Sequence, residues 1–208
     1  KELKEIIFSL IAKNPKTSAG IKITITGGPS LNGFSSGNPT LLMMYMSLVV
    51  PSEAMYSKGA TLMTFEYQRD LPLVKSVNYA QALALEKEWK GMGHIDVLYH
   101  EKGVISEVSR SSVFVVKDGK LKTNKRDVLA GVTQKNVLRA IDQLFEVEIA
   151  DIKLTEVFNA DELFITSTSK RILPIVSVDE HQIGKGKPGV VTSAIHVAFL
   201  ALIKRELT

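Results

Sequence analysis

Residues 96–133 read DVLYHEKGVISEVSRSSVFVVKDGKLKTNKRDVLAGVT, and this stretch decides the fold class. Short apolar runs are separated by turn residues, at 101–103 and at Asp118-Gly119, which is typical of β-hairpins. Gly131-Val132-Thr133 then opens an amphipathic helix predicted over 134–145. The pattern alone therefore predicts a soluble, enzyme-like α/β domain. The strands predicted within the stretch are 96–100, 104–108, 112–116 and 120–123.

The flanking sequence predicts further helices and strands on both sides. Before this stretch, the apolar spacing predicts helices at 1–12 and 79–89 and strands at 20–26, 40–48 and 59–67. After it, the predicted elements are strands at 146–149 and 162–166 and helices at 155–159 and 191–205. A long irregular loop, GGPSLNGFSSGNP, separates the first two strands, and loops of this length in compact domains often carry function.

The order of elements suggests two domains. Gln68 to Pro72 has the composition of a linker, so we place a boundary near Leu71. We expect a remnant of a small domain over 1–71 and a large domain over 72–208. The first helix starts at Lys1 with no cap residue or methionine before it, and we therefore expect further residues upstream.

Composition excludes several classes of protein. The 208 residues are 45% hydrophobic and 23% charged, which is ordinary for a soluble globular protein. No cysteine is present, which excludes disulfides, thiolate metal sites and a cysteine nucleophile. The net charge of +4 is scattered along the chain, so nucleic acid is not an expected partner. The longest nearly uncharged stretch contains Pro29 and Pro39, so we expect no membrane span and a cytoplasmic protein.

Common catalytic motifs are missing. The sequence has no G-x-G-x-x-G after a strand, no P-loop, no G-x-S-x-G and no H-E-x-x-H. His94, Asp96 and His100 could share one face of a strand as metal ligands, but the pattern is also that of ordinary half-exposed side chains, and we predict no metal. A serine nucleophile among residues 109–112 lacks a histidine partner at any recognisable spacing.

Five short motifs occur in a fixed order from Lys75 to Thr168. They are KSVNY at 75–79, GVISEVS at 103–109, DGKL at 118–121, LAGVT at 129–133 and ELFITST at 162–168. Together they resemble the class IV aminotransferases, the fold type IV family of pyridoxal phosphate enzymes. That family includes branched-chain and D-amino acid aminotransferases and aminodeoxychorismate lyase. The resemblance extends from Ile21 to nearly the end of the chain. It implies an α+β fold, with a large cofactor-binding domain and a remnant of a small N-terminal α/β domain, and the cofactor pyridoxal 5′-phosphate.

The resemblance assigns roles around the cofactor ring. Lys75 is implied as the catalytic lysine whose amine binds the cofactor aldehyde. Tyr79, expected one helical turn further on, would reach the ring hydroxyl. Glu107 would face the pyridine nitrogen and keep it protonated, because a buried carboxylate needs a cationic partner. Leu121 would pack against one face of the ring, or is a plain core leucine.

A second set of residues is implied around the phosphate. The Val132 and Thr133 amides open a helix, and a helix start favours an anion. Ser167 and Thr168 would hold the other side. Lys22 is a candidate clamp for the substrate carboxylate, the alternative being a lysine in solvent.

The sequence departs from the family pattern at three positions. Ser112 stands where the family usually has asparagine, and Gln134 stands where it has arginine. The family's phosphate-binding arginine falls before Lys1, so we expect this chain alone to bind the cofactor weakly.

The implied reaction is amino transfer between an amino acid, branched-chain or D, and a 2-oxo acid, in a homodimer. The alternatives are a lyase of the aminodeoxychorismate type and an inactive fragment.

Overall fold

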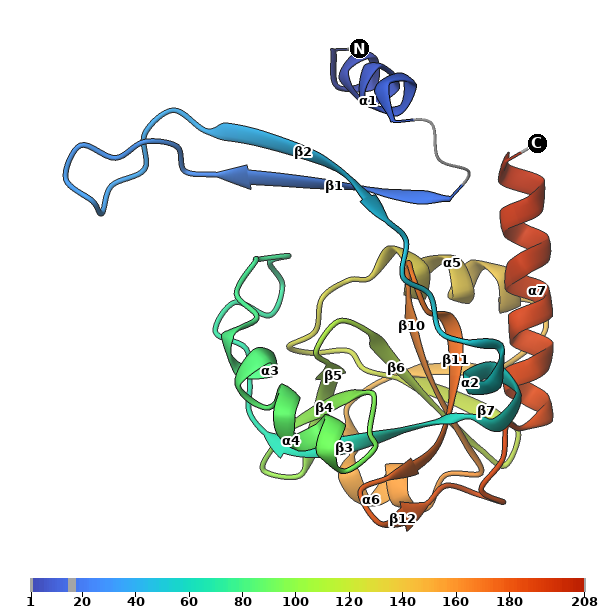
Figure 1. Ribbon diagram of the computed structural model, residues 1–208. Coiled ribbons are helices and arrows are strands. Elements are labelled where there is room, and N and C mark those ends of the chain that lie inside the picture. Colours follow the sequence, from blue (N-terminus) through green and yellow to red (C-terminus); the bar gives the residue numbers. More distant parts are fainter. Residues whose placement is uncertain (1, 15–17, 208) are drawn as a thin grey trace. The chain divides into compact units, whose positions relative to one another are not determined.

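The computed structural model describes residues 2–14 and 18–207 (Figure 1). The chain separates into two units, residues 1–50 and residues 51–208, and each is described by itself. Lys1 and Thr208, the outer ends of the two expected domains, lie outside the described residues. The observed division differs from the expected boundary near Leu71, because the strand Ala60–Glu66 (β3) is hydrogen-bonded inside the large sheet of the second unit.

The described residues of the first unit, 2–14 and 18–50, form one helix and one hairpin. Helix α1 spans Glu2–Lys13. Strands β1 (Ala19–Thr26) and β2 (Thr40–Ser47) confirm the two strands predicted here, and they pair antiparallel. The loop between them closes through a hydrogen bond from the Gly37 amide to the Gly27 carbonyl at 2.8 Å. Gly28 has a φ of 74°, and a Cβ atom there would meet a backbone oxygen at 1.6 Å, so this turn requires glycine.

The second unit is a mixed α+β domain. Its helices are α2 (Glu53–Lys58), α3 (Ala80–Ala84), α4 (Glu86–Gly91), α5 (Val132–Ile141), α6 (Leu154–Phe158) and α7 (Val190–Leu207). Its strands are β3 (Ala60–Glu66), β4 (Asp96–Glu101), β5 (Val104–Val108), β6 (Ser112–Lys117), β7 (Lys120–Thr123), β8 (Val147–Ile149), β9 (Ile152–Lys153), β10 (Glu162–Ser167), β11 (Arg171–Val178) and β12 (His181–Gln182).

One ten-stranded sheet organises this unit, with the order β8-β7-β6-β10-β11-β3-β4-β5-β9 and β12 paired to β11. Most neighbours are antiparallel, but β3 runs parallel to both β11 and β4, and β7 runs parallel to β8. Strand β3 is the first strand of this sheet along the chain, and it lies in the interior of the sheet and not at an edge. The segments that follow β3, β5 and β10 are thereby brought to one region of the unit.

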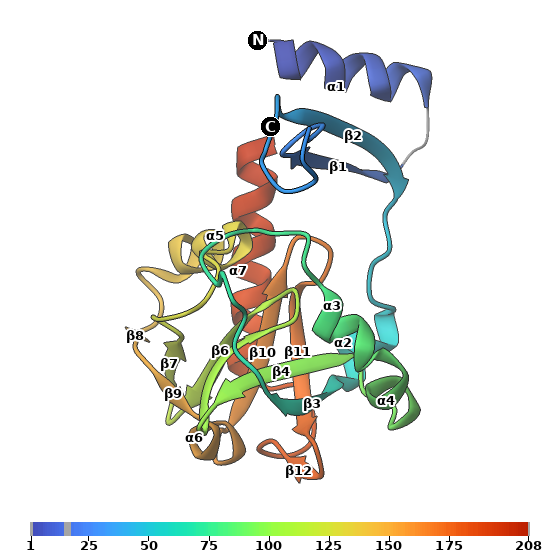
Figure 2. The same cartoon turned by 90° about the vertical axis from the view of Figure 1, so that its left-hand side faces the viewer.

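Alternation along the strands separates two cores. In β6, Val113 and Val115 belong to one apolar cluster, whereas Phe114 and Val116 belong to another on the opposite face. Helices α5 and α7 cover the second face and lie against each other, as Figure 2 also shows. None of the helices in the described part of the chain has the length and apolarity of a membrane span.

Several elements differ from the sequence-based expectation, which lacks the short elements α2, β9 and β12. The helix expected over 79–89 is two short helices, because the chain breaks from regular helix at Leu85. Strand β11 is absent from the sequence-based prediction, although it lies in the middle of the sheet between β10 and β3. It contains Pro174, a residue that is disfavoured within strands because it cannot donate a hydrogen bond to a neighbour.

Candidate active site

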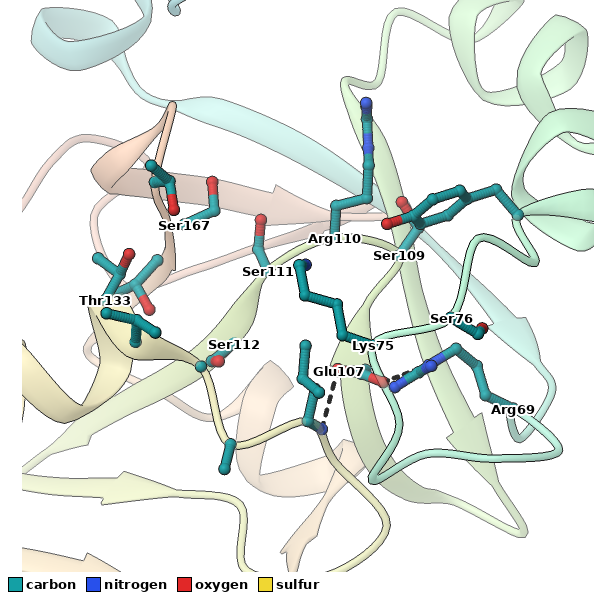
Figure 3. Close-up of a pocket in the computed structure, with 17 residues that line it drawn as sticks. Arg69, Lys75, Ser76, Glu107, Ser109, Arg110, Ser111, Ser112, Thr133 and Ser167 are labelled. Carbon is teal, nitrogen blue, oxygen red and sulfur yellow. Dashed lines mark hydrogen bonds and ion pairs between the residues drawn. The ribbon is translucent and has the colours of Figure 1, made fainter. Parts of the chain in front are cut away.

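Four segments far apart in the sequence converge on one pocket of about 290 Å³ in the second unit (Figure 3). They are the β3–α3 connection, the turn between β5 and β6, the loop that enters α5, and the end of β10. The pocket is lined by Arg69, Lys75, Ser76, Tyr79, Glu107, Ser109, Arg110, Ser111, Ser112, Leu129, Ala130, Gly131, Val132, Thr133, Thr166, Ser167 and Thr168.

Glu107 lies on β5 and is the only acidic side chain among the described lining residues. It is 6% exposed. One carboxylate oxygen accepts a hydrogen bond from Arg69 Nε at 2.6 Å, and the other accepts one from the Leu129 amide at 3.3 Å. Burial raises the pKa of Glu107, against the hydrogen bond and charge of Arg69, the Leu129 amide and the charge of Lys75. A carboxylate has about four acceptor positions, so Glu107 can accept a further hydrogen bond.

Arg69 is a site residue that the sequence analysis missed. Besides its ion pair with Glu107, its guanidinium donates to the backbone carbonyls of Leu71 and Val74, at 3.4 and 3.2 Å. Arg69 therefore ties the Glu107 carboxylate to the loop that carries Lys75. The stretch around Arg69 reads as a polar linker, and nothing in its spacing indicates a buried guanidinium.

Lys75 and Tyr79 both line the pocket, but they are not one helical turn apart. The chain has no regular structure at Lys75, and α3 starts only at Ala80, so the expected helical turn between the two residues is wrong. Figure 3 shows Lys75 extending between Glu107 and Ser111. Within the described part of the chain, its amine has no hydrogen-bond or ion-pair partner.

Uncommitted hydrogen-bond donors gather at another end of the pocket. The first backbone amides of any α-helix lack intrahelical acceptors. Helix α5 starts at Val132 after Gly131, which has no side chain that could accept from these amides. Thr133 and Ser167 lie near each other in Figure 3. The Thr166 hydroxyl is buried and has no partner among the described residues. Such an arrangement of amides and hydroxyls suits an anion.

A buried polar network supports the turn beside the pocket. Asp96 is 1% exposed, and its carboxylate accepts hydrogen bonds from Ser109 Oγ at 2.5 Å and from Lys170 Nζ at 3.1 Å. Lys170 Nζ also donates to Ser111 Oγ at 3.2 Å. Asp96 is thus engaged by an ammonium group, which is not compatible with its reading as a metal ligand. No cluster suited to a metal occurs among residues 2–14 and 18–207.

We expect the loss of one partner of the buried Asp96–Lys170 pair to be strongly destabilising. Lys170→Met should lower the free energy of unfolding by about 3–5 kcal/mol, because it leaves a buried carboxylate without its counter-charge. The double variant Asp96→Asn, Lys170→Met should recover most of that loss, since a neutral amide needs no counter-charge. Trp89, the only tryptophan, is buried in this unit, so its fluorescence in urea measures the effect. A single variant as stable as the parent would contradict this assignment.

Leu121 and Leu129 are placed differently with respect to this pocket. Leu121 does not line the pocket; it is 1% exposed and packs with Phe114 and Val116 in the core under α5 and α7. The register explains this, because Leu121 pairs with Val116 at the end of β6 away from Ser112. Leu129 lines the pocket instead, and the sequence analysis does not name it.

All the other residues predicted to bind the cofactor line this one pocket: Lys75, Tyr79, Glu107, Val132, Thr133, Ser167 and Thr168. Their roles stay predictions. Lys22 lies on β1, in the unit formed by residues 1–50, and its role as a carboxylate clamp also stays a prediction.

Comparison with known proteins identifies the family. The sequence model described as "Amino-transferase class IV" matches residues 1–178. The chain is 28% identical to a D-alanine aminotransferase of Listeria monocytogenes serotype 1/2a (strain 10403S), over 99% of this chain and 74% of that protein.

Two solved structures are also similar. The branched-chain amino acid aminotransferase of Escherichia coli superposes with a TM-score of 0.86 and 27% identity, over 97% of this chain and 71% of that one. The T.th. branched-chain amino acid aminotransferase with pyridoxamine 5′-phosphate gives a TM-score of 0.84 and 25% identity, over 98% and 71%. The α+β fold is therefore that of the fold type IV aminotransferases, and the chain belongs to the class IV aminotransferase family.

Proposed function

We propose that this chain uses pyridoxal 5′-phosphate to move an amino group between an amino acid and a 2-oxo acid. The observation that carries the proposal is the set of groups that line the pocket. They are an unpartnered lysine amine, a buried carboxylate and a helix start without a side-chain cap. Each of these features matches one functional group of the cofactor: the aldehyde, the pyridine nitrogen and the phosphate.

The hydrogen-bond donors at one end of the pocket fit the phosphate of the cofactor. The Val132 and Thr133 amides at the start of α5 would hold one side of the phosphate, aided by the helix dipole. Ser167 and Thr168 would hold the other. The buried Thr166 hydroxyl, which lacks a partner in the described part of the chain, would gain an acceptor from such an occupant.

The opposite end fits a protonated pyridine nitrogen. Glu107 keeps a free acceptor position beside its bonds to Arg69 and Leu129. A cationic N–H placed there would stabilise the ionised carboxylate, whose pKa burial raises. Tyr79 would hydrogen-bond the ring hydroxyl, and the apolar Leu129 side chain would cover one face of the ring.

Lys75 would act on the substrate. Because its amine is unpartnered in the described chain, it is available to bind the aldehyde and, once displaced, to remove the proton from the substrate's Cα as general base. When bound, pyridoxal 5′-phosphate supplies the electron sink that stabilises negative charge at that carbon. Arg69 keeps the Lys75 loop and Glu107 together throughout.

For the substrate, we propose a branched-chain amino acid or a D-amino acid. The relative named above is a D-alanine aminotransferase, and the similar structures are branched-chain amino acid aminotransferases. Turnover of both enantiomers of alanine and leucine, with 2-oxoglutarate as acceptor, separates the two classes. We also expect a homodimer, which light scattering measures directly.

The test of the proposed function is a covalent label. The protein loaded with pyridoxal 5′-phosphate is reduced with borohydride and digested, and we expect the pyridoxyl mass on the peptide that carries Lys75, because only an imine between aldehyde and amine is reduced in this way. Before borohydride is added, the loaded protein should show the absorbance band of the bound cofactor. Label spread over surface lysines, or on another single lysine, would exclude the proposed site.

A further inference from the structure

Arg110 is a cation that the proposed function leaves without a task. It lines the pocket and is exposed, and within the described residues it has neither an ion-pair nor a hydrogen-bond partner. The other pocket arginine, Arg69, is already bound to Glu107 at 2.6 Å. Lys75 is the only other lining cation without a partner in residues 2–14 and 18–207, and it is assigned to the aldehyde.

The backbone that carries Arg110 is firmly held. Val108 and Ser111 exchange two backbone hydrogen bonds, at 3.0 and 3.1 Å, which makes 108–111 a tight turn. Ser109 and Ser111, on either side of Arg110, are buried and bind Asp96 and Lys170. Only Arg110 of these three residues is exposed. The turn therefore presents a guanidinium at the pocket from a fixed position.

The location of Arg110 argues against a role at the phosphate. In Figure 3, Arg110 rises from its turn away from Glu107, and Thr133 and Ser167 lie together at a different side of the pocket. The phosphate charge is met there by the start of α5 and by hydroxyl groups. With Arg69 neutralised by Glu107 and Lys75 assigned to the aldehyde, one positive charge remains for an anionic group of the substrate.

We propose that Arg110 binds a carboxylate of the substrate and so determines which amino acids and 2-oxo acids this enzyme accepts. This inference rests on the proposed function, because it needs a substrate beside the cofactor. A guanidinium matches the planar carboxylate with two parallel hydrogen bonds, which a lysine cannot do. Two carboxylates could be the partner: the α-carboxylate that every amino acid has, or a second one at the end of an acidic side chain.

The experiment measures binding without turnover. Protein loaded with pyridoxal 5′-phosphate is titrated with propanoate, which has one carboxylate, and with glutarate, which has two, while the absorbance of the cofactor is followed. The variants are Arg110→Gln and Arg110→Lys. The control is Arg139→Gln, which removes an exposed arginine that pairs with Glu206 on α7, outside the pocket lining. The cofactor affinity of each variant is measured first.

We expect Arg110→Gln to weaken carboxylate binding about tenfold to a hundredfold, as for loss of a charge-assisted hydrogen bond, with Arg110→Lys intermediate and Arg139→Gln unchanged. Weaker binding of both acids assigns Arg110 to the α-carboxylate, whereas weaker binding of glutarate alone assigns it to a side-chain carboxylate. Unchanged affinity for both, or a loss of cofactor affinity alone, would overturn the inference and leave the proposed function standing. Failure of the parent protein to bind the cofactor would overturn both.

Discussion

Lys75→Ala is expected to abolish amino transfer. Removal of a general base alone typically costs about 10²–10⁴-fold in rate, and this variant also loses the amine that binds the aldehyde. Lys75 is exposed on an irregular connection and holds no partner in the described chain, so the fold should not depend on it. We therefore expect an unchanged urea midpoint together with a rate at the limit of detection. Single-turnover kinetics with a preformed cofactor complex measure the effect.

Lys87→Ala provides the matched control. Lys87 is an exposed lysine on α4 and does not line the pocket. It should retain the parent rate and the parent cofactor spectrum. A Lys75→Ala protein that keeps more than about a tenth of the parent rate would show that another group removes the proton, because no general-base contribution of the usual size would have been lost.

Glu107→Gln is expected to preserve cofactor binding and to slow removal of the Cα proton on the order of 10²-fold, the size seen when one preorganised electrostatic partner is lost. A neutral amide cannot stabilise a protonated pyridine nitrogen. The amide oxygen can still accept the hydrogen bond from Arg69, so the loop that carries Lys75 should stay in place. Exchange of the substrate's Cα proton with deuterated solvent measures this step separately from product release.

Two further measurements make this result specific to the site. Glu101→Gln, the same change at an exposed residue at the end of β4, should leave the exchange rate unchanged. Thermal unfolding of Glu107→Gln should show a loss of stability, since Arg69 would lose its buried counter-charge. Equal exchange rates in Glu107→Gln and the parent would remove Glu107 from the reacting centre.

Much of the fold can be predicted from local patterns, because most strands end at turn residues and most helices have one apolar face. The hairpins of 96–123 and the helix of α7 are confirmed for this reason. Strand β11 is different, since Pro174 argues locally against a central strand. Its neighbours β10 and β3 pair with it along both edges, and its side chains Ile172 and Leu173 are buried on the two faces of the sheet. This tertiary context outweighs the local preference.

The candidate site shows the same limit. Short motifs locate Lys75, Glu107 and the start of α5, because each chemical task needs a particular residue type. The choice between Leu121 and Leu129 depends on strand register and on where a loop returns, and neither can be read from the spacing of leucines. Arg69 escapes sequence reasoning because burial of its guanidinium depends on a carboxylate 38 residues away in the sequence.

The parallel pairing of β3 with β11 has a consequence for the order of folding. The Thr64 amide donates a hydrogen bond to Asp179 Oδ1 at 2.7 Å, across 115 residues of sequence. Loop closure over such a distance is slow, and during synthesis the early strand leaves the ribosome long before its neighbour exists. Leu62 and Met63, both buried in the finished sheet, stay uncovered until then. We therefore expect nascent chains that end before Val178 to recruit chaperones and to lack the pocket, because the strand that lies between β10 and β3 in the finished sheet has not yet been made.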